Sequence, residues 1–342
     1  MGAVPHGGAQ QRARLQLRAH RLVPAAGSVG RQVGRLLLRR LVDAVPVLIG
    51  VTLVSFALIH LTPGDPVRIL LGGHATPANV AALRHTLGLD RSLPAQYWQF
   101  LSGAFTGSFG QSIEYRTSVS SIVGPRIGAS ALLIGYALLV TILLAVPLAF
   151  LAALARDRAG DHAIRLGTTV TFAMPSFWVG LILSLLISLQ LGWLPPSGYG
   201  TTFAQHVEGL TLPAITIALS LSPLLIRILR SSLIDTLGAE YVSAMRARGQ
   251  RERRVLGRHV LRNSLTSTVT LLSLFFAVML SGTVVVENVF AIPGLGSLLV
   301  ASVSARDFPI IQALTFIFGV AVILAGLLAD VAQAAIDPRV RL

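Results

Sequence analysis

One short stretch of the chain combines an acid, small residues and arginines between two long apolar segments. It begins at Glu240 and continues through Tyr241, Ala244, Met245 and Arg248. Spacings of three and four residues place Leu237, Tyr241, Ala244, Met245 and Arg248 on one face of a helix. A small residue lets another backbone approach closely, and charged groups form ion pairs across an interface. The stretch therefore predicts a docking surface for a soluble protein.

Gly249 marks where this first helix is expected to end, because glycine enters the left-handed region without a steric penalty. A second apolar stripe at 255–260 follows, flanked by arginines, and the chain then reaches Asn263. Two short helices joined by a bend form a rigid protrusion that fits a groove on a partner. The alternative interpretation is a basic loop whose charge reflects membrane orientation alone.

The residue inventory excludes several kinds of chemistry. All 28 basic residues are arginine, and the chain has no lysine, which the phosphate-binding P-loop requires. No standard ATP site is therefore expected, and ATP-driven work would have to come from another subunit. The chain has no cysteine, and His60 has no histidine nearby, so no metal site is expected either.

The composition indicates an all-α integral membrane protein. Of 342 residues, 53% are hydrophobic and 12% are charged, and the mean hydropathy is +0.72. A spanning helix needs about 20 apolar residues, and six windows are long enough. The predicted spans are 41–61, 127–155, 166–191, 209–226, 263–286 and 308–329.

The distribution of arginine orients these spans. With both termini in the cytoplasm, 22 of the 28 arginines fall on cytoplasmic segments, as the positive-inside rule requires. The same sorting accounts for the net charge of +14, so nucleic-acid binding is not expected. The predicted location is a plasma membrane, crossed several times.

Two regions outside the membrane complete the predicted domain organisation. Residues 1–34 are expected to form a disordered, arginine-rich cytoplasmic tail attracted to anionic lipid, ahead of a membrane domain at 35–342. The extracytoplasmic region 62–126 is long enough to hold its own structure. One helix is predicted from Thr76, as cap, to Gly88, and another from about Pro94.

The order of residues in 234–262 resembles the EAA loop of binding-protein-dependent ABC importer permeases. Further motifs along the chain resemble the dipeptide and oligopeptide (peptide/nickel) branch of that family. These motifs are Leu61-Thr62-Pro63-Gly64-Asp65-Pro66, Leu87-Gly88-Leu89-Asp90, Gly107-Ser108-Phe109-Gly110, Leu191-Gly192-Trp193-Leu194-Pro195, Glu287-Asn288-Val289-Phe290 and Pro293-Gly294-Leu295-Gly296. Gln250 and Ser267 depart from the pattern, which usually has leucine and proline there. The lost proline predicts an unkinked start to the fifth span.

The resemblance implies a permease that is not itself an enzyme, with the fold of type I importers. It implies a second homologous permease, two ATPase subunits (or one fused) that bind ATP and Mg²⁺, and an extracytoplasmic substrate-binding protein. The implied substrate is a di- or oligopeptide, with nickel or another small solute as the alternative. The residues that fall on the coupling loop are Glu240, Tyr241, Ala244, Arg248, Gly249 and Asn263.

Three residues are candidates for a gate or for the pathway. Pro175 and Pro223 lie inside predicted spans, where proline kinks a helix or serves packing, and Glu287 lies near the outer end of the fifth span. Two other functional classes remain open: a stand-alone secondary transporter and an intramembrane enzyme. The first needs ionisable groups at mid-span, which the predicted spans nearly lack, and the second needs a nucleophile or metal set at bilayer depth.

Overall fold

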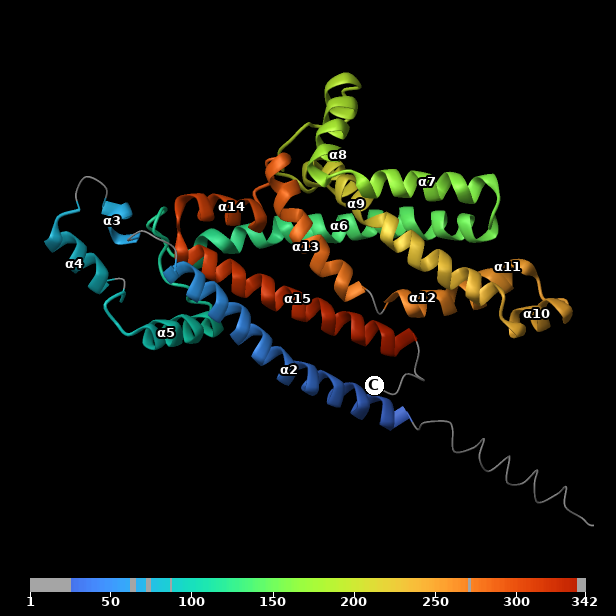
Figure 1. The fold of residues 1–342 in the computed structure, drawn as a ribbon, viewed down its shortest axis with the longest axis horizontal. Coiled ribbons are helices and arrows are strands. Elements are labelled where there is room, and N and C mark those ends of the chain that lie inside the picture. The colour runs from blue at the N-terminus through green and yellow to red at the C-terminus, as the bar shows by residue number, and fades with distance from the viewer. Residues whose placement is uncertain (1–25, 62–65, 72–74, 87, 270–271, 337–342) are drawn as a thin grey trace, which may run out of the picture.

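The computed structural model describes residues 26–61, 66–71, 75–86, 88–269 and 272–336. These residues form helices joined by short connections and contain no strand, in agreement with the predicted all-α class. Long helices lie side by side in the middle of the molecule, and short helices project from its two ends (Figure 1).

One end is formed by the region after the first long helix. Helix α2 (Ala26–Leu61) is followed by α3 (Pro66–Leu71), α4 (Pro77–Thr86) and α5 (Leu93–Thr106). As predicted, Thr76 caps α4: its hydroxyl accepts a hydrogen bond of 3.3 Å from the Asn79 amide. The predicted helix near Pro94 is α5, which begins one residue earlier. Helix α2 starts at Ala26, within the predicted tail 1–34, and residues 1–25 lie outside the described residues.

Within the described residues, four helices are long and apolar enough to cross a membrane. They lie at Leu38–Ala57 within α2, in α6 (Val119–Leu154), in α9 (Phe203–Leu237) and at Phe308–Gln333 within α15 (Phe308–Ile336). They contain most of the first, second, fourth and sixth predicted spans, and α9 continues well beyond 209–226. Pro213 and Pro223 lie inside α9 without ending it, as is common in membrane helices.

The third predicted span, 166–191, is not one straight helix. Helix α7 (Ala159–Ala173) ends before Pro175, where the chain bends by 104°. Helix α8 (Ser176–Leu183) follows the bend and continues directly as the π-helical η2 (Ser184–Gln190). Met174 is extended, with φ −87° and ψ 130°, because the proline ring excludes the helical conformation of the residue before it. Counting this bent pair as one span brings the number of spans to five within the described residues.

The fifth predicted span, 263–286, falls on two shorter helices. These are α12 (Arg262–Val269) and α13 (Leu272–Val289), and residues 270–271 between them lie outside the described residues. Helix α12 continues through position 267, as expected without the usual proline. A further apolar helix, α14 (Leu295–Ala305), precedes α15 and has no counterpart among the predicted spans.

The helices pack in two groups, one around α9 and one along α15. Helices α6 and α9 make the most extensive pairing, α7 packs on both, and α2 lies along α15. An ion pair of 2.7 Å between Arg40 and Asp330 joins these last two helices. The loop after α9 forms α10 (Glu240–Ala247), α11 (Glu252–Arg254) and the π-helical η3 (Val255–Leu261). It lies at the opposite end from α3–α5 (Figure 1).

Candidate coupling site

Helix α10 presents four of the predicted coupling residues to its surroundings. Glu240, Tyr241, Ala244 and Arg248 are all exposed, and we call this set the docking face. Within the described residues, the side chains of Glu240 and Arg248 form no hydrogen bond or ion pair. Glu240 also lies in the first turn of α10, where the helix dipole favours a negative charge. The docking face therefore offers charged groups that are accessible to another molecule.

The opposite face of α10 holds the helix on the bundle. Val242 is fully buried, and Met245 packs against the same apolar cluster, together with Val255 and Val260 of η3. The sequence pattern placed Met245 on one face with Tyr241, but the two differ in burial: Met245 is partly buried against this cluster, whereas Tyr241 is 39% exposed. The cluster also includes residues of α6 and α9, so the short helix is anchored to the long ones.

Gly249 ends α10 as the sequence predicted. Its φ of +72° lies in the left-handed region, and the Gln250 amide donates to the Met245 carbonyl over 3.2 Å, a bond typical of a glycine-terminated helix. The turn is also bridged by side chains. Arg246 donates to Glu252 through Nη2 at 2.6 Å and through Nε at 3.2 Å, which fixes the angle between α10 and α11.

The start of α12 contacts α10 and α9. The Asn263 side-chain amide lies 3.5 Å from the Tyr241 hydroxyl, so two predicted site residues meet across the loop. Ser264, adjacent to Asn263, is fully buried and donates to the Ser232 carbonyl at 3.2 Å. These contacts connect the base of the docking face to the helix that enters the bundle.

The third gate candidate, Glu287, is buried where α13 meets α6 and the start of α14. We call this site, with Ser130, Gly296 and Ser297, the seat of Glu287. Its side chain is fully buried on α13. Oε1 accepts a hydrogen bond of 2.6 Å from the Ser130 hydroxyl of α6. Oε2 accepts bonds of 2.7 Å and 3.0 Å from the amides of Gly296 and Ser297 in the first turn of α14. This carboxylate caps α14, which is a structural role in this conformation.

The two proline candidates lie in different surroundings, and the structure does not bring them into contact with Glu287. Pro175 stands at the break between α7 and α8, where the chain bends by 104°. Pro223 is buried within α9. Their roles in gating stay predictions.

Sequence reasoning did not identify two polar groups that position the helices. One is Ser130, whose only signal was a hydroxyl in a long uncharged span. The other is the pair of Asp161 and Arg230, which joins α7 to α9 through hydrogen bonds of 2.7 Å and 2.5 Å while Asp161 is fully buried. Its partners are 69 positions apart, so spacing along the chain gave no indication of the contact.

Comparison with known families matches two parts of the chain. The family described as binding-protein-dependent transport system inner membrane component matches residues 145–342. The N-terminal family of the same membrane components matches residues 33–130. Together these matches cover the long helices, the docking face and the seat of Glu287.

Similar proteins extend over almost the whole chain. The glutathione transport system permease protein GsiC of Salmonella typhimurium is 36% identical over 89% of this chain and 98% of its own length. The oligopeptide transport system permease protein AppB of Bacillus subtilis is 34% identical over 89% of this chain and 98% of its own length. Among solved structures, the inward-facing MetNI methionine ABC transporter matches 63% of this chain and 96% of its own chain. Its TM-score of 0.50 at 12% identity supports a shared fold.

Proposed function

Because the chain belongs to the family of binding-protein-dependent transport system inner membrane components, we propose that it is a permease subunit that imports di- or oligopeptides. The docking face carries the coupling part of this proposal. The peptide part is supported by the relatives, whose names refer to glutathione and oligopeptide transport. ATP hydrolysis in such systems belongs to a separate subunit, consistent with the absence of lysine from this chain.

Coupling is proposed to run through α10. Glu240 and Arg248 offer opposite charges at the two ends of the docking face, and exposed Ala244 lies between them and permits close approach. A short helix of this kind suits a groove on an ATPase subunit. The buried contacts of Val242 and Met245 then transmit movement of α10 to α6 and α9.

The arrangement in the membrane is proposed from the charge distribution. Both termini and the docking face lie in the cytoplasm, where arginines border the spans, and α3–α5 lie outside. A second homologous permease would complete the pathway, and an extracytoplasmic binding protein would deliver the substrate near α3–α5. The opposite placement of α10 and α3–α5 in the fold supports this assignment (Figure 1).

Reversing one charge on the docking face tests the coupling. We expect Glu240→Lys to reduce co-purification of the ATPase subunits at least about tenfold and to abolish peptide-stimulated ATP hydrolysis, because a desolvated charge at an interface is worth a few kcal/mol. Asp235→Lys is the matched control, since Asp235 is an exposed acid near the end of α9 and outside the docking face. Unchanged values for Glu240→Lys, or equal losses in both variants, would contradict the proposal.

The substrate class needs a separate test. A strain that lacks this gene and needs an amino acid should fail to grow when that amino acid is supplied only as a dipeptide or tripeptide. Growth on the free amino acid is the control. Normal growth on the peptides, combined with impaired nickel accumulation, would reject peptides and indicate the metal ion as substrate.

A further inference from the structure

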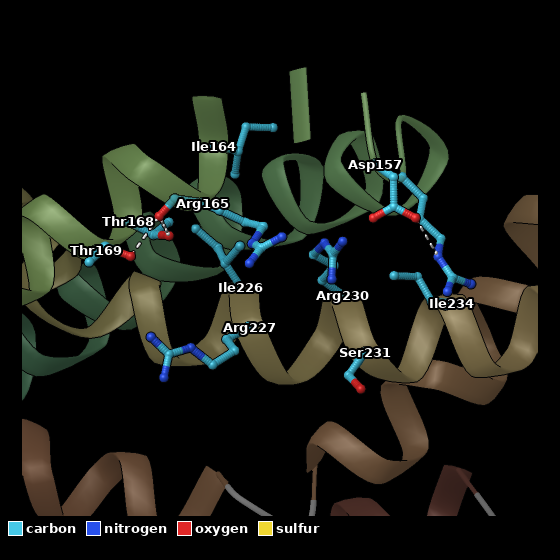
Figure 2. A pocket seen from close by; sticks show the side chains of 11 residues that line it. Asp157, Ile164, Arg165, Thr168, Thr169, Ile226, Arg227, Arg230, Ser231 and Ile234 are labelled. Carbon is cyan, nitrogen blue, oxygen red and sulfur yellow. Dashed lines mark hydrogen bonds and ion pairs between the residues drawn. The ribbon is translucent and has the colours of Figure 1, made fainter. Parts of the chain in front are cut away.

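A cavity of about 510 Å³ opens between α7 and α9. Figure 2 shows Arg165 of α7 and Arg230 of α9 extending into the space between these two helices. Arg156 and Arg227 also line the cavity, and Ile164 and Ile226 form apolar walls. The cavity thus joins several guanidinium groups to an apolar lining.

Only part of this positive charge is balanced within the protein. Arg230 is held by the buried carboxylate of Asp161, and Arg156 lies 3.3 Å from Asp157. Arg165 and Arg227 are exposed, and neither forms an ion pair in the part of the chain that the structure describes. The cavity therefore keeps a positive charge that an anion can neutralise.

The geometry of the fixed arginine favours a phosphate group over a simple halide ion. Asp161 binds Arg230 through both Nε and Nη2, so this guanidinium is oriented before any ligand arrives. Guanidinium groups bind phosphate oxygens with pairs of parallel hydrogen bonds. Arg165, across the cavity on α7, supplies a second guanidinium without a partner of its own.

Helix α7 also carries exposed apolar side chains outside the cavity lining. Leu166 and Val170 of α7 are 66% and 46% exposed, and their spacing of four residues places them on one side of the helix. In the orientation proposed above, this apolar face begins at the cytoplasmic end of a span. A ligand with a phosphate and acyl chains could therefore place its headgroup in the cavity and its chains along α7.

From these observations we propose that the cavity between α7 and α9 binds a phosphate group through Arg165 and Arg230, and that an anionic phospholipid supplies it. The site is separate from the docking face and does not depend on which solute is transported. It would fix lipid between the two helices at the inner membrane surface.

Lipid retention by the complete transporter tests this site. The complex is purified in detergent, supplied with phosphatidylglycerol or with phosphatidylcholine, and analysed by native mass spectrometry. A parallel titration uses inorganic phosphate alone and follows thermal stability. Arg165→Gln removes one guanidinium from the cavity. Arg158→Gln is the matched control. Arg158 immediately precedes α7 and is exposed, but it does not line the cavity.

We expect wild type to retain phosphatidylglycerol and not phosphatidylcholine, with an apparent affinity that falls about tenfold in Arg165→Gln, because a charged hydrogen-bonding partner is lost. Arg158→Gln should retain the lipid as wild type does. Stabilisation by inorganic phosphate, lost in Arg165→Gln and without retention of lipid, would support the phosphate site and overturn the lipid as its source.

Three results would overturn the site itself. The first is equal loss of lipid in both variants, which would indicate general surface charge. The second is binding of neither phosphate source. The third is retention by the isolated chain but not by the complete transporter, which would show that the second permease covers the cavity. Normal co-purification of the ATPase subunits with Arg165→Gln confirms that the variant folds.

Discussion

Glu240 and Glu287 are two glutamates that the sequence singled out, yet they lie in opposite environments. Glu240 is exposed at the start of α10 and has no side-chain partner within the described residues. Glu287 is fully buried, and its carboxylate receives one hydroxyl and two amide hydrogen bonds. An acid whose bonds are complete inside the protein holds the fold, whereas an exposed acid on an anchored helix is available to a partner.

The comparison also separates two kinds of glycine. Gly294 and Gly296 lie against Glu287, and a Cβ added to Gly294 would come within 2.3 Å of its carboxylate. Gly249 has nothing within 4 Å of an added Cβ but adopts a φ of +72°. Gly294 is needed because a larger side chain would clash with Glu287, whereas Gly249 is needed because its backbone is left-handed.

The largest expected effect lies at the buried seat. Glu287→Ala leaves the Ser130 hydroxyl and the amides of Gly296 and Ser297 without an acceptor, at a cost of about 3 kcal/mol or more. The apparent melting temperature of the purified complex should fall clearly. Glu208→Ala, at an exposed acid of α9, should leave it nearly unchanged. A Glu287→Ala protein with normal stability but no transport would contradict the structural role of Glu287 and would support its assignment as a gate residue.

A smaller effect is expected at the turn after α10. Gly249→Ala places a side chain in the left-handed region, which costs about 1 kcal/mol, with no steric clash. Hydrogen exchange at the amides of α10 should accelerate several-fold while the amides of α9 keep their protection. Gly257→Ala serves as control, because an added Cβ has open space there and φ is not positive. Equal acceleration in both variants would argue against the turn as the origin of the effect.

The smallest effect concerns the bridge across that turn. The hydrogen bond from Arg246 lowers the pKa of Glu252 below its ordinary value of 4.5. A lowered folded-state pKa means that the bridge stabilises the turn fully above pH 4.5, and that this stabilisation is lost as the pH falls through the lower folded-state value. The measurement is an NMR titration of the labelled Glu252 carboxyl. Its midpoint should rise toward 4.5 in Arg246→Gln and stay low in Arg248→Gln.

Local features of the fold followed well from the sequence. Thr76 and Gly249 were identified as helix boundaries because capping and left-handed glycine depend on neighbouring residues alone. The long apolar helices were found for a similar reason, since a span of uniform hydropathy needs no knowledge of its neighbours. The helix at 240–247 was predicted from its residue spacing for the same reason.

Features that depend on tertiary contacts were missed. The bend at Pro175 could have been a mild kink, since Pro213 and Pro223 lie in an unbroken α9, and only the packing of α8 distinguishes these cases. Ser130 and Glu287 are 157 positions apart, and nothing in one sequence aligns them. The partial burial of Met245 was not predicted, because helical spacing fixes which residues are neighbours but not which side meets the bundle.

The way α10 is anchored has a mechanical consequence. Val242 of α10 and Val260 of η3 share one close-packed cluster with Leu229 and Leu233 of α9, and such interiors resist compression. Because α10 shares this cluster with α9 and α6, a force on Tyr241 is transmitted through close-packed side chains to these two long helices. If α10 couples to an ATPase as proposed, its displacement is therefore expected to pass to α9 and α6 with little loss.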